Sequence, residues 1–302
     1  MYNKTVIIVA GPTAVGKTAV AIDIALACNT SIISADSRQC FRELSIGVAR
    51  PSEDELRQVH HDFIASHSIT EELNAAGFEQ YALQKVSGIF QTKNTAVVAG
   101  GTGLYIKAFC EGLDEVPAVP PEIRADINSF YETNGIEWLQ EQLREKDPAF
   151  FEKGEMKNPQ RMMRALEVME ATGRSVLDFR TGRSVQRDFN IVKIGLELPR
   201  DLLYQRINTR VDDMITAGLI DEARNLLPYR HLNSLQTVGY AELFACFDNT
   251  ITLERAIELI KQNSRRYAKR QMTWFKKDPA FTWFNPQQFE EIIAHIRKQI
   301  IL

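Results

Sequence analysis

The first third of the chain alternates short apolar runs with polar turns, a pattern typical of buried strands in a parallel sheet. The runs are TVIIVA at residues 5–10, SIISA at residues 31–35 and TAVVA at residues 95–99. Between the first two, residues 17–27 carry apolar side chains at helical spacing. This order predicts a β-α-β unit at the start of an α/β fold.

Another β-rich run lies much later in the chain, at residues 189–198, and we expect it to join the same sheet. Everything between would then be an insertion. The sequence predicts a core of residues 1–113 and 188–302, interrupted by a helical subdomain at residues 114–187. Beyond the returning strand we expect only helices.

The predicted insertion contains its own helix signals. Three prolines mark its entry, and its body has a helical pattern. Asn158 and Pro159 are typical of an N-cap and a first helical turn, and Gly173 is typical of a helix end. These signals predict a helix that begins near residue 159 and ends near residue 172.

The strongest motif follows the first strand, where GPTAVGKT matches GxxxxGK[ST] between a strand and a helix. Its glycines let backbone N–H groups turn toward phosphate oxygens, and the helix N-terminus adds partial positive charge. Lys17 supplies a cation, and the Thr18 hydroxyl is suited to binding Mg²⁺. The motif predicts a polyphosphate site, without deciding for ATP, formed by Gly11, Pro12, Thr13, Ala14, Val15, Gly16, Lys17 and Thr18.

An acidic residue follows the second strand and not the third. Asp36 ends the second run, whereas the third runs into GGTG at residues 100–103. Because ligands of open α/β sheets bind beyond the carboxyl ends of the strands, we expect Asp36, the phosphate loop and this turn to meet in one crevice. Asp36 is suited to accept a proton from a nucleophile. Indirect Mg²⁺ binding or helix capping is the alternative.

Positive charge is concentrated in two segments of a chain whose formal net charge is −3. That total excludes a protein coated all over in positive charge. Residues 157–187, which include Arg183, carry a net charge of +4, and residues 261–277 carry +7 with no acid. The rest of the chain holds about −14.

The second basic segment has the composition of a nucleic-acid surface. Tyr267, Trp274 and Phe275 lie among its cations, as in surfaces that stack bases, although core packing is the alternative for each. A solvated helix face is the alternative for the charges. Like charges four residues apart repel one another, which favours an anionic partner for Arg265, Arg266, Lys269 and Arg270.

Two weaker features involve pairs of residues. Arg206 and Arg210 lie one helical turn apart and could clamp a diphosphate, with a salt-bridged surface helix as the alternative. His60 and His61 are adjacent and form a poor chelate, so we interpret them as loop or structural residues.

The cysteines indicate reduced thiols, because they form no CxxC pair and have no histidine at metal spacing. They are Cys28, Cys40, Cys110 and Cys246. No apolar run approaches the ~18 residues of a membrane span. We expect a cytoplasmic protein with no membrane partner.

Eight motifs stand in one order along the chain: GPTAVGKT, ADSRQ, SIGVARPS, HH, GGTGLY, NPQRMMRALEVMEATG, TVGYAEL and RRYAKRQMTWF. Together they resemble the tRNA dimethylallyltransferase family, the tRNA isopentenyltransferases, from residue 5 to about 284. The eukaryotic zinc-finger extension is not in the sequence, which we interpret as the bacterial type. Departures at Val15, Cys40–Phe41 and residues 62–64 leave Lys17, Thr18 and Asp36 in place.

The resemblance implies an α/β, P-loop NTPase-like core with a parallel sheet flanked by helices and an inserted helical tRNA-binding subdomain. It implies transfer of a dimethylallyl group from dimethylallyl diphosphate to N6 of the adenosine 3′ of the anticodon, flipped out of its loop. Asp36 would be the base. Lys17, Thr18, Arg206 and Arg210, with Mg²⁺, would stabilise the leaving diphosphate.

The same resemblance implies a set of tRNA contacts. We expect the anticodon stem-loop of tRNA and dimethylallyl diphosphate as partners of a monomer. The implied contacts are Asp36, Ser37, Arg38, Gln39, Thr102, Arg124, Gln160, Arg161, Met162, Met163 and Arg164.

Two other functions share part of this pattern. A P-loop small-molecule kinase, of the adenylate or shikimate kinase type, would share the loop, the sheet and Mg²⁺, with Arg206 and Arg210 in its lid. It leaves both basic segments unexplained. A non-catalytic RNA-binding GTPase-like or ATPase-like module would not need Asp36.

Overall fold

The computed structural model describes residues 4–182 and 184–301 and divides the chain into two compact units. The first comprises Met1–Glu111 and Gln186–Leu302, and the second comprises Gly112–Val185. The boundaries predicted from the sequence lie two residues later, at 114 and 187.

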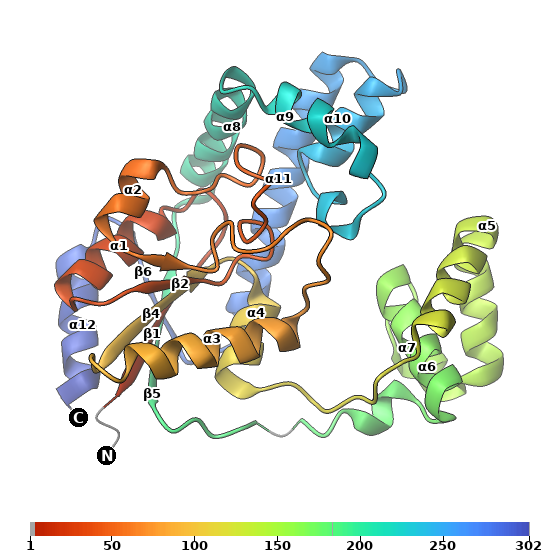
Figure 1. The fold of residues 1–302 in the computed structure, drawn as a ribbon, viewed down its shortest axis with the longest axis horizontal. Helices are drawn as coiled ribbons and strands as arrows, with labels where there is room; N and C mark the ends of the chain where they lie inside the picture. The colour runs from red at the N-terminus through yellow and green to blue at the C-terminus, as the bar shows by residue number, and fades with distance from the viewer. Residues whose placement is uncertain (1–3, 183, 302) are drawn as a thin grey trace. The chain divides into compact units, whose positions relative to one another are not determined.

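The first unit is built on a sheet whose six described strands are all parallel, in the order β3-β2-β4-β1-β5-β6. Figure 1 labels β1, β2, β4, β5 and β6 in this unit. This arrangement confirms the predicted fold class. β1 is the centre of the sheet and pairs with β4 on one side and β5 on the other. The strands are β1 (Thr5–Ala10), β2 (Ile32–Ser34), β3 (His61–Asp62), β4 (Thr95–Gly100), β5 (Asn190–Leu196) and β6 (Phe281–Phe284).

The four inner strands confirm the predicted strands, and the two edge strands were missed. β3 pairs with β2 over His61 and Asp62 alone, and β6 continues the sheet beyond β5. The expectation of helices only after residue 198 is therefore wrong. Both edge strands are too short to show an apolar period in the sequence.

Helices cover both faces of the sheet. Ile7 and Val9 of β1 share one apolar cluster with Ile24, Ile207 and Ile292 from three helices. The alternate β1 residues are also buried and face the other side, which α3 and α4 cover. The helices of this unit are α1 (Lys17–Ala27), α2 (Glu53–Gln58), α3 (Ala75–Ile89), α4 (Gly103–Glu111), α8 (Arg200–Thr216), α9 (Leu219–Leu226), α10 (Tyr240–Phe247), α11 (Leu253–Phe275) and α12 (Phe289–Ile301), with 3₁₀ turns η2 (Leu227–Tyr229) and η3 (Asn233–Leu235).

The second unit is helical and has its own apolar core, which includes Leu139, Leu143 and Phe150. Its third helix has the predicted caps: the Asn158 side chain accepts from the N–H of Arg161, and Gly173 ends the helix in the left-handed region with φ of 68°. The elements are α5 (Pro121–Lys146), α6 (Pro148–Lys153), α7 (Pro159–Thr172) and η1 (Val176–Phe179).

Arg187 belongs to the first unit and not to the basic insertion. Its guanidinium donates to the carbonyls of Ala108 and Phe109, at 2.9 and 2.8 Å, and to Glu79 at 2.6 Å. Its charge is therefore neutralised inside the core unit, which corrects its assignment to the basic surface. Arg183, counted in the same segment, lies outside the described residues.

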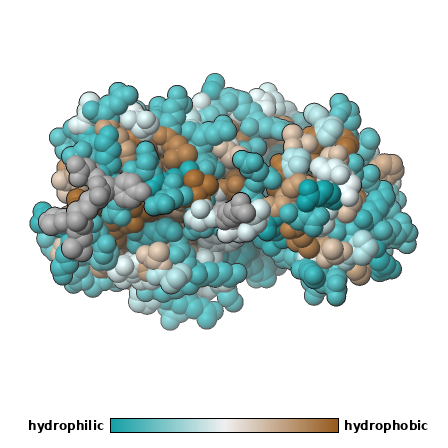
Figure 2. All heavy atoms as spheres, turned by 90° about the horizontal axis from the view of Figure 1, so that it is seen from below, coloured by the Kyte–Doolittle hydropathy of each residue, from teal (hydrophilic) through white to brown (hydrophobic). Residues whose placement is uncertain are grey.

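Polar and charged side chains cover most of the face drawn in Figure 2, with apolar side chains showing between them. Among the described helices, none combines the length and the apolar character that crossing a membrane requires.

Candidate active site

A cleft of about 520 Å³ opens where β1, β2 and β4 end. Lys17 and Thr18 line it from the phosphate loop, Asp36 from the segment after β2, and Gly100 from the end of β4. The structure thus brings together the three segments that the sequence predicted to meet. Parallel strands explain this, because their carboxyl ends lie at one edge of the sheet.

The phosphate loop turns sharply into α1. Gly16 has φ of 108°, a left-handed conformation that glycine adopts without strain, and the helix begins at Lys17. Lys17 Nζ donates to the carbonyl of Pro12 at 2.7 Å. Burial lowers the pKa of Lys17 to about 8, against the opposing effect of Asp36 and with a further lowering from Arg210.

Both predicted arginines of α8 reach the phosphate loop. Arg210 Nη1 donates to Thr13 Oγ1 at 3.2 Å, and Arg206 Nη1 donates to the carbonyl of Val15 at 3.4 Å. Burial lowers the pKa of the Arg210 guanidinium, while Asp36 raises it. Arg210 lines the cleft. These bonds fit a diphosphate clamp better than a salt-bridged surface helix.

Asp36 is held by the turn that follows it. Its Oδ1 accepts from the N–H groups of Arg38 and Gln39, at 2.9 and 3.2 Å. Gln39 in turn donates from Nε2 to the carbonyls of Val48 and Ala49, at 3.2 and 2.9 Å. The carboxylate therefore caps a turn, not a helix as one alternative expected, and it also lines the cleft.

The turn after β4 packs directly on the Asp36 segment. A Cβ at Gly100 would lie 2.1 Å from the Ala35 carbonyl oxygen, so only glycine permits this approach. Thr102 Oγ1 accepts from the N–H of Ser37 at 3.0 Å and contacts Ser37 Oγ at 3.3 Å. Thr102 acts here through Ser37 and fixes the turn beside Asp36.

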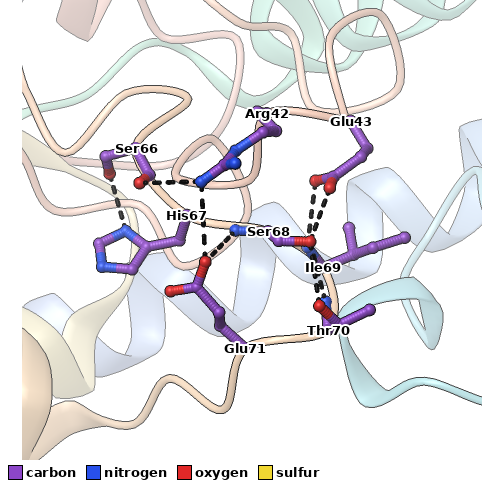
Figure 3. Close-up of polar contacts among 8 residues, drawn as sticks. All are labelled: Arg42, Glu43, Ser66, His67, Ser68, Ile69, Thr70 and Glu71. Carbon is purple, nitrogen blue, oxygen red and sulfur yellow. Dashed lines mark hydrogen bonds and ion pairs between the residues drawn. The ribbon is translucent and has the colours of Figure 1, made fainter.

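A polar network anchors the chain just beyond this turn (Figure 3). Glu43 accepts from Ser68 Oγ at 2.7 Å and from the N–H of Ile69 at 3.0 Å. Arg42 forms an ion pair with Glu71 at 3.7 Å, and Glu71 also accepts from the N–H of Ser68. These bonds tie residues 42–43 to residues 66–71 and hold the end of the Asp36 segment in place.

Glu222 of α9 is a site residue that the sequence analysis missed. Its carboxylate accepts from the N–H groups of Ser45, Ile46 and Gly47, at 3.0, 2.9 and 2.9 Å, and from Tyr240 Oη at 2.7 Å. The loop it holds forms a wall of the cleft. The SIGVARPS and TVGYAEL motifs contain the bonded residues, but neither motif shows that they meet.

The cations of α11 form a separate surface. Arg265 donates to Asn208 at 2.6 Å, Arg266 to Asn263 at 3.4 Å, and Arg270 lies over the Tyr267 ring. A shallow hollow of about 220 Å³ lies farther along the helix. It is lined by Lys269, Arg270, Thr273, Trp274 and Lys277.

The aromatic residues of this helix divide by exposure. Tyr267 and Trp274 are each 38% exposed, whereas Phe275 is 2% exposed and packs in the core. The base-stacking interpretation is therefore wrong for Phe275, which lies on the inward face of the helix.

The predicted tRNA contacts in the insertion also divide. Arg164 and Arg124 both bond to the buried carboxylate of Glu167, at 3.1 and 3.3 Å, and Arg161 pairs with Glu155. Gln160 is exposed. Met162 and Met163 are buried in the apolar core of this unit, so their side chains do not form an outward surface there, which corrects that expectation.

Several weaker expectations concern histidines and cysteines. His61 Nδ1 lies 2.8 Å from the Val59 carbonyl oxygen, and burial lowers its pKa, which fits a structural role. The four cysteines are unpaired thiols. Burial, followed by the effect of Asp36, raises the pKa of Cys40 to about 12.

Within residues 4–182 and 184–301, no group of three His, Cys, Asp or Glu side chains could hold a metal ion.

Comparison with known proteins shows the family of the chain. The family model for IPP transferases matches residues 39–278, which is most of the chain. The chain belongs to the IPP transferase family.

Relatives of this IPP transferase match it along almost its entire length. The tRNA dimethylallyltransferase of Cytophaga hutchinsonii is 46% identical over 99% of this chain and 98% of its own. The full-length tRNA isopentenylpyrophosphate transferase of Bacillus halodurans is 36% identical, with a TM-score of 0.72 over 99% of this chain and 97% of its own. A eukaryotic dimethylallyltransferase acting on tRNA is 26% identical, with a TM-score of 0.72 over 90% of this chain and 69% of its own.

Proposed function

We propose that this protein transfers the dimethylallyl group of dimethylallyl diphosphate to N6 of the adenosine 3′-adjacent to the anticodon in tRNA. The observation that carries the proposal is the cleft that the phosphate loop, Arg210 and Asp36 line together, with Arg206 bonded to the same loop. Membership of the IPP transferase family, with relatives named tRNA dimethylallyltransferase, supports the same reaction.

The lining of the cleft suits both parts of the donor. At one end, Lys17 and Arg210 provide positive charge beside the N-terminus of α1 for a diphosphate. Val211, Met214 and Leu219 also line the cleft, and their apolar side chains suit a five-carbon chain. A volume of about 520 Å³ lies within the range of small-molecule sites.

In this reaction a bond forms between N6 and C1 of the allyl group as the C1–O bond to the diphosphate breaks. The electron pair of that bond leaves with the diphosphate, and the proton lost from N6 goes to Asp36. Lys17, Arg206 and Arg210 stabilise the charge that develops on the leaving group, and such stabilisation usually accelerates group transfer more than any other single effect. The hydrogen bonds from the N–H groups of Arg38 and Gln39 to Oδ1 hold the Asp36 carboxylate in one orientation for this proton transfer.

The donor set at the cleft fits Mg²⁺. Magnesium typically keeps several waters and binds one or two protein oxygens together with substrate phosphates. The Thr18 hydroxyl would hold it, and Asp36 lines the same cleft for a contact through water. When bound, the ion supplies neutralising charge to the diphosphate.

The target base has to leave its stacked position to reach this cleft. Arg38 and Tyr267 line the cleft, and in this proposal they lie on the side that the RNA approaches. Tyr267 belongs to α11, whose cations would bind the RNA backbone. Phosphate contacts from such a helix position the RNA, while unpaired loop bases are read individually.

The test is a modification assay. Unmodified tRNA is incubated with the protein, Mg²⁺ and either dimethylallyl diphosphate or ATP, and its nucleosides are analysed by mass spectrometry. We expect one five-carbon unit on adenosine with dimethylallyl diphosphate. Phosphorylation of a small metabolite by ATP, with no change in the tRNA, would replace the proposal by a kinase.

A further inference from the structure

Gln271 bridges the two sides of the cleft from α11. Its side chain is buried, with 6% of the residue exposed. Its Oε1 accepts from the N–H of Thr13 at 2.8 Å, and its Nε2 donates to the carbonyl of Gly101 at 2.9 Å. One amide therefore spans from the phosphate loop to the turn after β4.

Each bond reaches a different half of the site. Thr13 is also the residue whose hydroxyl accepts from Arg210, so its backbone is held by α11 and its side chain by α8. Gly101 precedes Thr102, whose hydroxyl bonds the N–H of Ser37 next to Asp36. The first bond holds the phosphate loop, residues 11–18, which we call the diphosphate cradle. The second bond holds the turn that is linked to the segment carrying Asp36, the proposed general base.

The close approach of Gln271 depends on glycine at position 101. A Cβ there would lie 2.3 Å from Nε2 of Gln271, and this glycine is itself buried. Because the oxygen and the nitrogen of one amide bond to backbone groups of different segments, the amide links the phosphate loop to the turn just beyond the paired ends of β1 and β4. An error of about 1 Å in the spacing of such segments can cost about 10²-fold in rate.

We infer that Gln271 is a positioning residue that fixes the distance between the diphosphate cradle and the turn bearing Asp36. This inference rests on the proposed function, since it assigns a diphosphate to the phosphate loop. Gln271 touches no reacting atom and acts through Thr13 and Gly101.

The test uses three variants of the full chain. Gln271→Met removes both bonds at similar side-chain volume. Thr102→Val removes only the link from the turn to Ser37. Gln262→Met makes the same chemical change on the same helix, outside the residues that line the cleft, and is the matched control.

Two measurements separate the two halves of the site. Calorimetry with inorganic pyrophosphate and Mg²⁺, without tRNA, reports the cradle, and kcat for transfer to tRNA reports the alignment. We expect Gln271→Met to weaken pyrophosphate binding about tenfold and to lower kcat about 10²-fold. Thr102→Val should lower kcat with pyrophosphate affinity unchanged, and Gln262→Met should change neither.

The inference is overturned if Gln271→Met, with a wild-type circular dichroism spectrum, binds pyrophosphate as tightly as wild type. It is also overturned if Gln271→Met and Gln262→Met lose equal activity, because the loss would then follow helix stability alone. A wild-type protein that binds pyrophosphate but transfers no dimethylallyl group would defeat the proposed function, while the calorimetric comparison would still decide the role of Gln271.

Discussion

The cations of the cleft and those of the insertion differ in the groups that they contact. Lys17 and Arg210 donate to a carbonyl and a hydroxyl, which leave the positive charge in place. Arg124 and Arg164 instead share the carboxylate of Glu167, which neutralises part of theirs. A cation that is bonded only to neutral oxygens keeps its charge for an anionic ligand. The groups that a cation contacts therefore indicate its function better than the number of cations in a segment does.

The basic segment at residues 261–277, most of which lies in α11, resembles the cleft in its middle and the insertion near its ends. Arg265 bonds to the amide oxygen of Asn208, a neutral partner. Lys261 and Lys276, near the two ends of that segment, pair with Asp212 and Glu197. The uncompensated charge is therefore concentrated in the central turns, where we place the RNA.

The carboxylates of Asp36 and Glu167 differ in the same way, because Asp36 has neutral partners and Glu167 has two arginines. The largest effect that we expect, on the rate of transfer, tests this difference. Asp36 accepts backbone N–H groups, which are neutral partners and leave its carboxylate able to take a proton. Asp36→Asn keeps the oxygen that caps the turn and removes the basic group. We expect the rate of transfer to fall about 10²–10⁴-fold, measured in single-turnover assays, with tRNA affinity nearly unchanged.

A transfer rate within threefold of wild type for Asp36→Asn would reassign Asp36 to capping alone. Asp54→Asn, on the exposed side of α2, is the matched control and should leave the rate as it is.

The second prediction compares the two basic surfaces. Glutamine at four cations of α11 should weaken tRNA binding and reduce its salt dependence by about 0.7–0.9 log units for each phosphate that the helix no longer binds. Four glutamines in the insertion should reduce the slope less, because those arginines are ion-paired. The sets are Arg265, Arg266, Lys269 and Arg270 against Arg124, Arg161, Arg164 and Arg174.

Both sets would be measured by fluorescence anisotropy with labelled tRNA over a range of salt concentrations. Equal slopes for the two sets would show that pairing with carboxylates does not decide which cations meet phosphate.

The third prediction concerns pH and Lys17. Because burial lowers its pKa to about 8, the free protein loses this ammonium as the pH rises through 8. Pyrophosphate affinity should therefore weaken up to about tenfold between pH 7 and pH 9 relative to Lys17→Arg, whose charge persists. Calorimetry of both proteins cancels the titration of the ligand itself. Parallel pH profiles would contradict the role of Lys17.

The smallest effect concerns stability. Glu167→Gln removes the negative charge of a buried carboxylate that bonds to two arginines and should lower the free energy of unfolding by about 1–3 kcal/mol. Arg206→Gln breaks only a 3.4 Å bond to a carbonyl and should cost less. Urea denaturation of both variants measures the difference. A greater loss for Arg206→Gln would reverse the comparison.

The inner strands, α1 and the caps of α7 could be predicted because each depends on residues close in sequence. The meeting of Asp36 with the phosphate loop followed from the rule for parallel sheets. The bonds of Glu222 to residues 45–47 could not be predicted, because they join segments more than 170 residues apart. The exposure of the aromatic side chains could not be predicted either, because Trp274 and Phe275 are neighbours in sequence, yet Trp274 faces solvent and Phe275 is buried.

The register of the central strand has a consequence for synthesis of the chain. Thr5 of β1 pairs with Asn190 of β5, so the second neighbour of this strand does not exist until most of the protein has been made. The insertion, whose elements are contiguous in sequence, emerges complete before that point. Chains fold by domains from the N-terminus as they emerge. During synthesis, β1 should therefore be paired with β4 alone until β5 is made. The helical insertion, which follows β1 in the sequence, should fold before β1 gains this second neighbour.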